Sequence, residues 1–218
     1  QTIERGIDLN FFDPKSISKN DIKNAIKNYD LKEDSIKILL PARVTEWKGH
    51  LILVDAVSQL LEKKVLNIEV LFFGPDQNKL LKEKIENSIR HKNLQHIIKF
   101  YGPTNKMNLI YALSDIVISS STDPEAFGRV SIEAQAMGKL IIASAHGGSQ
   151  ETILEGKTGY LYSPKNPFEL MEKISSVIDQ KTYCSNEMSA SAIEHIKSNY
   201  GKDKMCKKTL EFYQEIIG

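Results

Sequence analysis

The sequence contains no apolar run close to the roughly 20 residues that a membrane-spanning helix needs. It has only two cysteines in 218 residues, Cys184 and Cys206, and no group of Cys and His residues has the spacing of metal ligands. We therefore expect two reduced thiols in the cytoplasm rather than a disulfide or a metal pair.

An excess of charge of one sign is also missing. The chain has 29 Lys and Arg against 28 Asp and Glu, which leaves a net charge of +1. Proteins that bind nucleic acid or an anionic membrane surface usually carry a marked excess of basic residues. We therefore expect no nucleic-acid partner.

Two common nucleotide-binding motifs are absent as well. Gly74 follows an apolar run, but Pro75 and Asp76 come next, so no full Gly-x-Gly-x-x-Gly forms, and no P-loop sequence occurs. Both motifs use glycines that let the backbone approach a phosphate. Their absence counts against a dehydrogenase and against an ATPase.

Short apolar runs that alternate with helical patterns predict the fold. The expected strands cover residues 36–40, 68–73, 97–101, 116–118 and 140–143. Apolar residues at helical spacing predict helices over residues 51–61, 78–91, 106–113, 127–137, 168–179, 187–199 and 202–217. This alternation indicates an α/β fold, a Rossmann-like doubly wound parallel sheet.

The stretch from Asp123 to Gly138 is the centre of the predicted site. It follows the apolar run 116–118 and leads into an expected helix, which Gly138 ends. In an open parallel sheet, ligands bind beyond the carboxyl ends of the strands, where helix N-termini attract anions. Glu125 stands just ahead of the helix, where its carboxylate could cap it, and Glu133 lies about two turns inside.

A basic loop follows the first expected strand in the same way. Arg43 and Lys48 lie between strand 36–40 and the next helix. A guanidinium binds two phosphate oxygens at once and Lys adds a point charge, so the pair suits a diphosphate. The alternative is that both side chains are simply solvated. Trp47 is expected to pack rather than to take part in chemistry.

Both stretches resemble sequences of retaining glycosyltransferases of family GT4, which have the GT-B architecture. Glu125 and Glu133 fit the Glu-x7-Glu signature, with Phe-Gly after the first Glu and Ala after the second. Arg43 and Lys48 fit the stretch Gly/Ala-Arg-x4-Lys-Gly. The resemblance implies that the chain is the C-terminal, donor-binding half of such an enzyme.

The resemblance also assigns roles to residues. Arg43 and Lys48 would hold the diphosphate of a nucleotide-diphospho-sugar. The catalytic candidate, Glu125, would contact the hydroxyls of the donor sugar, and Glu133 those of the ribose. Further donor-binding groups are expected where the helix begins, at Phe127, Gly128, Arg129 and Val130. No cofactor or metal ion is expected, since the chain lacks the Asp-x-Asp motif that the metal-using GT-A transferases usually carry.

Some residues allow other interpretations. Glu133 could pair with Arg129 four residues earlier on the same helix, which is worth only about a few tenths of a kcal/mol. Gly147 and Gly148 could let the backbone approach a ligand or could only turn the chain. His146 is expected to be a loop residue rather than a catalyst.

The resemblance further divides the chain. Residues 1–34 are expected to form an interdomain connector with a short surface helix. Residues 35–200 would form the nucleotide-sugar-binding domain, and residues 201–218 a C-terminal crossing helix. A further N-terminal domain, which would bind a glycan or lipid-linked acceptor, is expected ahead of residue 1. The 218-residue chain is then expected to bind a nucleoside diphosphate but to transfer little or no sugar.

The sequence around the two glutamates looks most like transferases that build bacterial lipopolysaccharide or other envelope glycans. Such an enzyme would act in the cytoplasm, and docking to the inner face of the plasma membrane is expected only for the full-length protein. Two other functions stay open. One is a sugar-nucleotide epimerase of GT-B type, which needs no acceptor, and the other is a nucleotide-sugar-binding module without catalysis.

Overall fold

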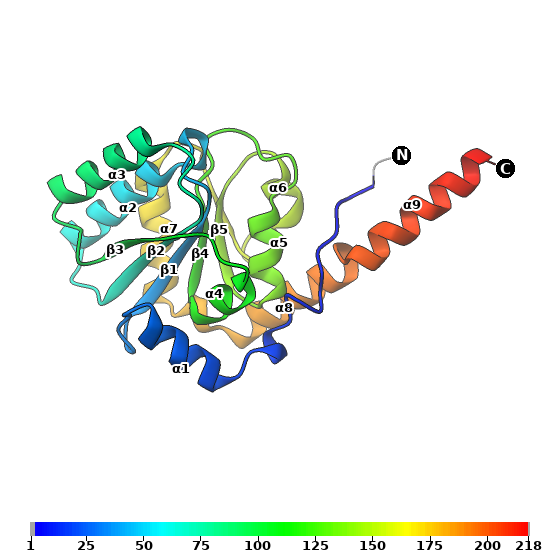
Figure 1. The fold of residues 1–218 in the computed structure, drawn as a ribbon, viewed down its shortest axis with the longest axis horizontal. Helices are drawn as coiled ribbons and strands as arrows, with labels where there is room; N and C mark the ends of the chain where they lie inside the picture. Colours follow the sequence, from blue (N-terminus) through cyan, green and yellow to red (C-terminus); the bar gives the residue numbers. More distant parts are fainter. Residues whose placement is uncertain (1–2, 218) are drawn as a thin grey trace.

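A parallel sheet forms the centre of the computed structural model, which describes residues 3–217 (Figure 1). Within these residues the strand order is β3-β2-β1-β4-β5-β6. The strands are β1 (Ile36–Pro41), β2 (Ile68–Phe73), β3 (Ile98–Tyr101), β4 (Ile116–Ser119), β5 (Leu140–Ser144) and β6 (Tyr160–Tyr162). All five expected strands are confirmed. The short edge strand β6 was not predicted, because three residues do not show a period.

Helices connect the strands and cover both faces of the sheet. They are α1 (Lys19–Asn28), α2 (His50–Lys63), α3 (Lys79–His91), α4 (Met107–Leu113), α5 (Arg129–Ala136), α6 (Gly148–Thr152), α7 (Pro167–Asp179), α8 (Asn186–Asn199) and α9 (Lys202–Ile217). The expected helices are confirmed, although α5 begins two residues later than expected. The segment expected as a loop after β5 contains the short helix α6, which the two glycines before Ser149 concealed in the sequence.

The strands are apolar throughout because both faces of the sheet are buried. Successive side chains point to opposite faces, so Ile38 and Leu40 join one core while Leu39 joins the other. Helices α2, α3 and α7 cover the first face, and helices α1, α4, α5 and α8 cover the second. The helices on the second face include α5, which carries Glu133.

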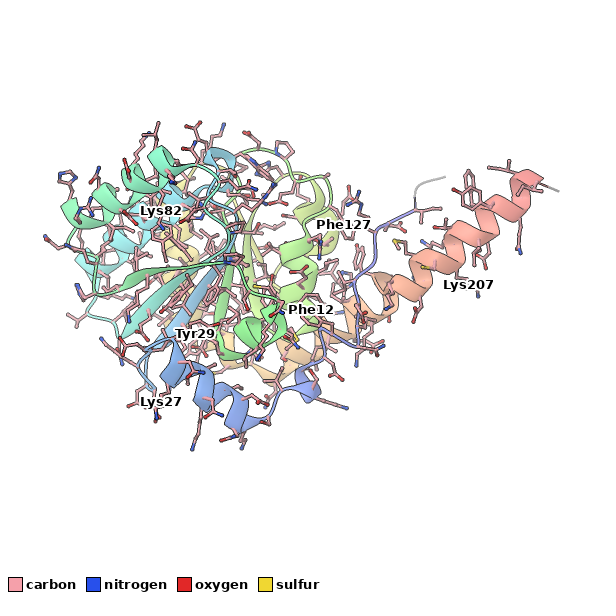
Figure 2. The ribbon with its side chains drawn as sticks, viewed as in Figure 1. Phe12, Lys27, Tyr29, Lys82, Phe127 and Lys207 are labelled. Atoms are coloured by element: carbon pink, nitrogen blue, oxygen red, sulfur yellow. The ribbon has the colours of Figure 1, made fainter. Side chains whose placement is uncertain are left out.

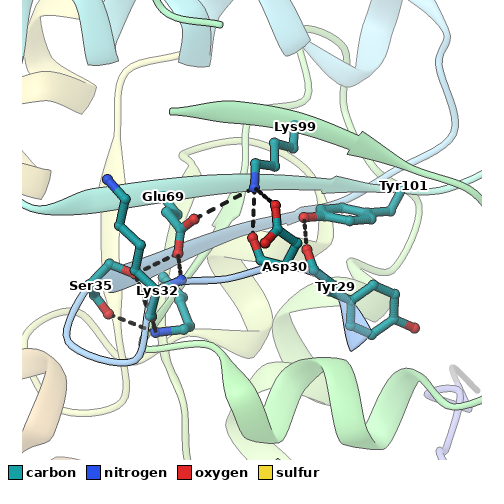
Figure 3. A network of polar contacts seen from close by, with 8 residues as sticks. Tyr29, Asp30, Lys32, Ser35, Glu69, Lys99 and Tyr101 are labelled. Atoms are coloured by element: carbon teal, nitrogen blue, oxygen red, sulfur yellow. Dashed lines mark hydrogen bonds and ion pairs between the residues drawn. The ribbon is translucent and has the colours of Figure 1, made fainter. Parts of the chain in front are cut away.

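The segment between α1 and β1 is fixed to the sheet by a buried carboxylate (Figure 3). Glu69 on β2 accepts hydrogen bonds from the Lys32 backbone N–H at 2.8 Å and from Ser35 Oγ at 2.7 Å. Beside it, the Tyr101 hydroxyl donates to the carbonyl of Tyr29 at 2.9 Å. These contacts hold the chain that enters β1 in one place.

Helix α9 extends away from the body, with the N-terminal segment beside it (Figure 1). Lys208 on α9 pairs with Glu4 at 2.7 Å, and Lys202 pairs with Asp8 at 2.7 Å. Large apolar side chains on α9, among them Leu210, are exposed. None of the helices that the structure describes is both long and apolar enough to pass through a membrane.

Candidate functional site

The connections from β1 and β4 leave the sheet on opposite sides, although the two strands are neighbours. This change of direction opens a crevice at the carboxyl ends of the two strands, which is where ligands bind in open α/β sheets. The loop 42–49 follows β1, and the loop 120–128 follows β4. The two sequence motifs therefore meet at the switch point of the sheet.

Hydrogen bonds tie the two loops to each other. Ser120 Oγ donates to the carbonyls of Lys48 at 3.0 Å and Gly49 at 3.1 Å, and the Thr122 N–H donates to the Trp47 carbonyl at 2.7 Å. Gly49 has φ +67°, and a Cβ there would lie 1.8 Å from the Ser120 carbonyl oxygen. Only glycine fits this position. The glycine that follows Lys48 in the motif is thus required by the contact between the loops.

Lys48 and Glu125 form an ion pair in the crevice. The Lys48 Nζ contacts Glu125 Oε1, and Ser121 Oγ donates a hydrogen bond to the same oxygen. The Lys48 ammonium also lies 4.0 Å from the centroid of the Trp47 ring. Among residues 3–217, no group donates a hydrogen bond to Glu125 Oε2. This second oxygen can accept hydrogen bonds from a ligand.

Glu125 does not cap the following helix, contrary to the sequence-based expectation. The N-cap position of α5 is Gly128, with φ +74° and no side-chain cap, and the helix begins at Arg129. Because the helix begins later than expected, Glu133 lies about one turn inside it. The first N–H groups of a helix have no intrahelical acceptor and carry partial positive charge. Val130, in the first turn of α5, lines the same narrow space as Lys48 and Ser121, so the N-terminus of α5 borders the crevice.

Glu133 is buried on α5, with one partner on each oxygen. Tyr111 donates to Oε2 at 2.9 Å, and the Arg129 guanidinium pairs with Oε1 at 2.9 Å. Burial raises the pKa of Glu133, while the Arg129 charge and the Tyr111 hydrogen bond act in the opposite direction. The i,i+4 pair with Arg129 is therefore present, and it leaves room for further hydrogen bonds, because each carboxylate oxygen accepts about two.

Two cavities meet at Glu133. One of about 230 Å³ is lined by Arg43, Pro103 and Tyr111, and one of about 650 Å³ by Phe127 and Arg129. Both also touch Thr104, Met107 and Glu133. Phe12 and Phe127, which line the larger cavity, lie on the side of the body that faces α9 (Figure 2). The smaller cavity lies at the carboxyl ends of β1 and β2, and the larger one lies between the body and the N-terminal segment beside α9.

The predicted donor-binding residues Lys48 and Arg43 lie in different parts of the site. Lys48 lies against Glu125, whereas Arg43 shares the smaller cavity with Glu133. The Arg43 guanidinium is exposed and donates to Gln77 Oε1 at 3.4 Å. Within residues 3–217 Arg43 and Lys48 share no hydrogen-bond partner, since Arg43 donates to Gln77 and Lys48 to Glu125. Val130 lies beside Lys48 in a narrow space between the loops.

Three side chains in the site were not predicted as site residues. Tyr111 lies on α4, far from either motif in the sequence, and Ser121 is one of three consecutive serines with nothing to single it out. Trp47 was expected only to pack, but it contacts the Lys48 ammonium. Its place directly before Lys48 was the one available signal, since an aromatic ring attracts a cation.

Gly147 and Gly148 are explained by contacts within the protein. The Gly148 N–H donates to the Glu125 carbonyl at 2.8 Å. A Cβ on Gly147 would lie 2.3 Å from the Glu125 carbonyl oxygen, and a Cβ on Gly148 would lie 2.3 Å from the carbonyl carbon of Phe127. These glycines let the loop after β5 approach the loop after β4, an interpretation that the sequence alone did not provide.

Residues 3–217 contain no group of three or more Asp, Glu, His or Cys side chains that could hold a metal ion. Cys184 and Cys206 are both free and exposed. The polar groups of the site include a Lys, two Arg and two Glu side chains, the hydroxyls of Ser121 and Tyr111, and the N-terminus of α5.

Residues 21–198 match the family model described as glycosyl transferases group 1. The chain belongs to this family. It is 27% identical over 222 residues to spore coat protein SA of Bacillus subtilis, a match that covers 99% of this chain and 58% of the relative. It is 28% identical over 179 residues to lipopolysaccharide 1,2-N-acetylglucosaminetransferase of Salmonella typhimurium, covering 79% and 47%. The chain thus spans about half the length of these curated relatives.

Solved structures agree with this assignment. A glycosyltransferase from Rickettsia africae superposes with a TM-score of 0.92 at 34% identity, covering 99% of this chain and 56% of that one. The Anabaena protein HepE in complex with UDP superposes with a TM-score of 0.90 at 24% identity, covering 99% and 57%. The expected Rossmann-like fold, one half of a GT-B architecture, is confirmed.

Proposed function

We propose that this chain is the donor-binding half of a retaining GT4 glycosyltransferase and that it binds a nucleotide-diphospho-sugar in the crevice between β1 and β4. The observation that carries this proposal is the contact between Lys48 and Glu125 at the switch point of the sheet. A cation for the diphosphate and a carboxylate for the sugar lie side by side, as a sugar bonded directly to a diphosphate requires.

The positive groups of the crevice suit the leaving group. When the bond between the sugar and the diphosphate breaks, negative charge grows on the diphosphate. Lys48, Arg43 and the N–H groups at the start of α5 stabilise this charge, because preorganised donors act most strongly where charge develops. We propose that these groups take the place of a metal ion.

The two glutamates orient the two ends of the donor. Glu125 offers Oε2 to hydroxyls of the sugar while Lys48 and Ser121 hold Oε1. Glu133 accepts hydrogen bonds from the ribose hydroxyls in the smaller cavity, which it shares with Arg43. A carboxylate that accepts from two neighbouring hydroxyls fixes a sugar in one orientation.

The biological role that we propose is more specific than the family assignment. One relative is named a lipopolysaccharide 1,2-N-acetylglucosaminetransferase and one similar structure contains UDP, which supports a nucleotide-sugar donor and a role in envelope glycan synthesis. We place this reaction in the cytoplasm, where free thiols such as Cys184 and Cys206 persist. A further domain of the natural protein would bind the acceptor, so the 218-residue chain transfers little or no sugar.

Titration calorimetry of the chain with UDP, GDP and ADP, and then with their sugar conjugates, tests the proposal. Saturable binding of one nucleotide, and tighter binding of its sugar conjugate, is the expected result. Absence of binding to all three nucleotides would contradict the proposal. A nucleotide-sugar that changes configuration when incubated without an acceptor would instead identify an epimerase.

A further inference from the structure

We propose that His146 is a positioning residue for Glu125 and acts through the backbone of Ser121. The inference rests on the proposed function, because it assumes that Glu125 contacts the donor sugar. His146 lies in the loop after β5, outside both sequence motifs, and the mechanism described above does not use it.

The His146 ring is held at one nitrogen by two buried partners. Its Nε2 lies 2.7 Å from the Ser121 carbonyl oxygen and 3.0 Å from Ser144 Oγ. A carbonyl oxygen can only accept, so Nε2 carries the hydrogen and donates. Ser144 Oγ donates to the same Ser121 carbonyl at 2.8 Å. Ser121 and Ser144 are almost completely buried, at 1% and 2% exposure.

This arrangement fixes the residue that holds the Glu125 carboxylate. The Ser121 hydroxyl donates to Glu125 Oε1, and its carbonyl receives the two donors from the loop after β5 and from the end of β5. With the carbonyl fixed, the Ser121 side chain keeps its direction toward Glu125. His146 therefore influences the Glu125 carboxylate through Ser121, without contacting it.

The backbone of Glu125 has a separate support. The Gly148 N–H donates to the Glu125 carbonyl at 2.8 Å, and this bond does not involve His146. Loss of the His146 donor should thus rotate the Glu125 side chain without moving its backbone. Arg43 and Glu133, on the nucleotide side, form no hydrogen bond with His146 or Ser121 in the described residues.

The proposal predicts a selective loss. We define the sugar gain as the Kd of a nucleoside diphosphate divided by the Kd of its sugar conjugate. In His146→Leu the sugar gain should fall roughly fivefold, the effect of losing about one hydrogen bond, while the Kd of the nucleoside diphosphate stays within about twofold. A general structural role would weaken both ligands together.

Two matched variants separate hydrogen bonding from folding. The Gln side chain places an amide N–H at the same number of bonds from Cβ as His Nε2, whereas the Asn side chain is one bond shorter. His146→Gln should therefore restore the sugar gain and His146→Asn should not. Thermal melting would reveal whether His146→Leu fails to fold. In that case the comparison of His146→Gln with His146→Asn still tests the inference.

The experiment is calorimetry of the 218-residue chain with UDP, GDP and ADP and their glucose conjugates. Combining His146→Leu with Glu125→Gln should cause no further loss of sugar gain beyond Glu125→Gln alone. An unchanged sugar gain in both His146→Leu and His146→Asn, or an equal loss for both ligands, would overturn the inference. A wild-type chain that binds none of these nucleotides would overturn the proposed function itself.

Discussion

The two glutamates of the site are almost equally buried, with side chains 13% and 11% exposed, but they are held in different ways. Glu125 lies on a loop and depends on Lys48 and Gly148, which come from other connections of the sheet. Glu133 lies inside a helix, and one of its partners is Arg129, one turn earlier. The sugar side of the site is thus assembled by tertiary contacts, and the ribose side largely by helix geometry.

This difference predicts how substitutions on each side of the site affect the two glutamates. Changes in the loops after β1, β4 or β5 should reorient Glu125, because its position depends on contacts among all three loops. Changes around Glu133 should stay local, because α5 keeps the Glu133 backbone in place whatever its partners do. The four predictions below run from the largest expected effect to the smallest: three test this contrast, and one, on His50, tests the helix that follows Lys48.

Removal of either basic side chain should have the largest effect. Lys48→Ala and Arg43→Ala should each weaken nucleoside diphosphate binding by about 1.5–3 kcal/mol, the value of a charged hydrogen bond. Only Lys48→Ala should also reduce the sugar gain, since Lys48 pairs with Glu125 whereas Arg43 donates to Gln77. Calorimetry measures both quantities.

Arg90→Ala is the control for this pair, because Arg90 is an exposed cation in the last turn of α3 and lines neither the smaller cavity nor the space beside Lys48. It should leave both affinities unchanged. Unchanged affinity in Lys48→Ala and Arg43→Ala as well would contradict the assignment of the diphosphate to this crevice.

Acid should destabilise the fold through the helix behind Lys48. His50, the first residue of α2, is buried between Phe72 and Phe100, and burial followed by the Lys48 charge lowers its pKa to about 4. The unfolded chain binds a proton at its ordinary pKa of 6.5, so stability is complete above that pH and is lost as the pH falls toward 4. At pH 5 the loss should be about 2 kcal/mol.

Urea unfolding at pH 7 and pH 5 measures this loss. His50→Phe keeps an aromatic ring of similar size and should remove the contribution of His50 to the pH dependence. His96→Gln, at an exposed position, should not change it. The same pH dependence in His50→Phe and in the wild type would show that the acid sensitivity arises elsewhere.

Glu133→Gln should affect ribose recognition and leave the sugar gain intact. A neutral amide oxygen is a weaker acceptor than a carboxylate, so the preference for a ribose over a 2′-deoxyribose nucleotide should fall by about 1 kcal/mol. Glu125→Gln is the matched control and should show the opposite pattern, with a lower sugar gain and an unchanged ribose preference. An undiminished ribose preference in Glu133→Gln would place the ribose elsewhere.

Tyr111→Phe should have the smallest effect and should appear mainly in the pH profile. The Tyr111 hydrogen bond lowers the pKa of Glu133, which burial raises. Without it the carboxylate takes up a proton at higher pH, so nucleotide binding, which needs the carboxylate, should begin to fail at higher pH on acidification. Binding isotherms from pH 7.5 to 5 measure the shift.

Tyr101→Phe removes a hydrogen bond of equal length, 2.9 Å, that does not involve Glu133. It should leave the pH profile unchanged. A profile in Tyr111→Phe that matches the wild type would exclude a role for this hydroxyl in setting the charge of Glu133.

The sequence predicted what local patterns determine. Apolar runs such as residues 68–73 give strands wherever both faces are buried, and β2 has these bounds. The spacing of Arg129 and Glu133 correctly indicated an ion pair along one helix. The expected start of α5 was wrong by two residues, because Phe127 and Gly128 continue the apolar and small-residue pattern while Gly128 has a left-handed backbone.

Contacts between distant segments could not be predicted in this way. Lys48 and Glu125 are 77 residues apart in the sequence, and only the order of the strands brings them together. The same holds for Gly147, whose conformation depends on how closely the loop after β5 approaches Glu125. Family resemblance placed Lys48 and Glu125 at one donor, but their direct contact is a property of the folded chain.

A crystal structure of this chain with the nucleoside diphosphate that binds it in calorimetry tests the central claim most directly. We expect the terminal phosphate to lie between the Lys48 ammonium and the N–H groups of Arg129 and Val130 at the start of α5, with the ribose against Glu133. A diphosphate bound in any other place, such as beside Arg5 in the larger cavity with Lys48 still paired only with Glu125, would contradict the assignment of the crevice between β1 and β4 as the donor site.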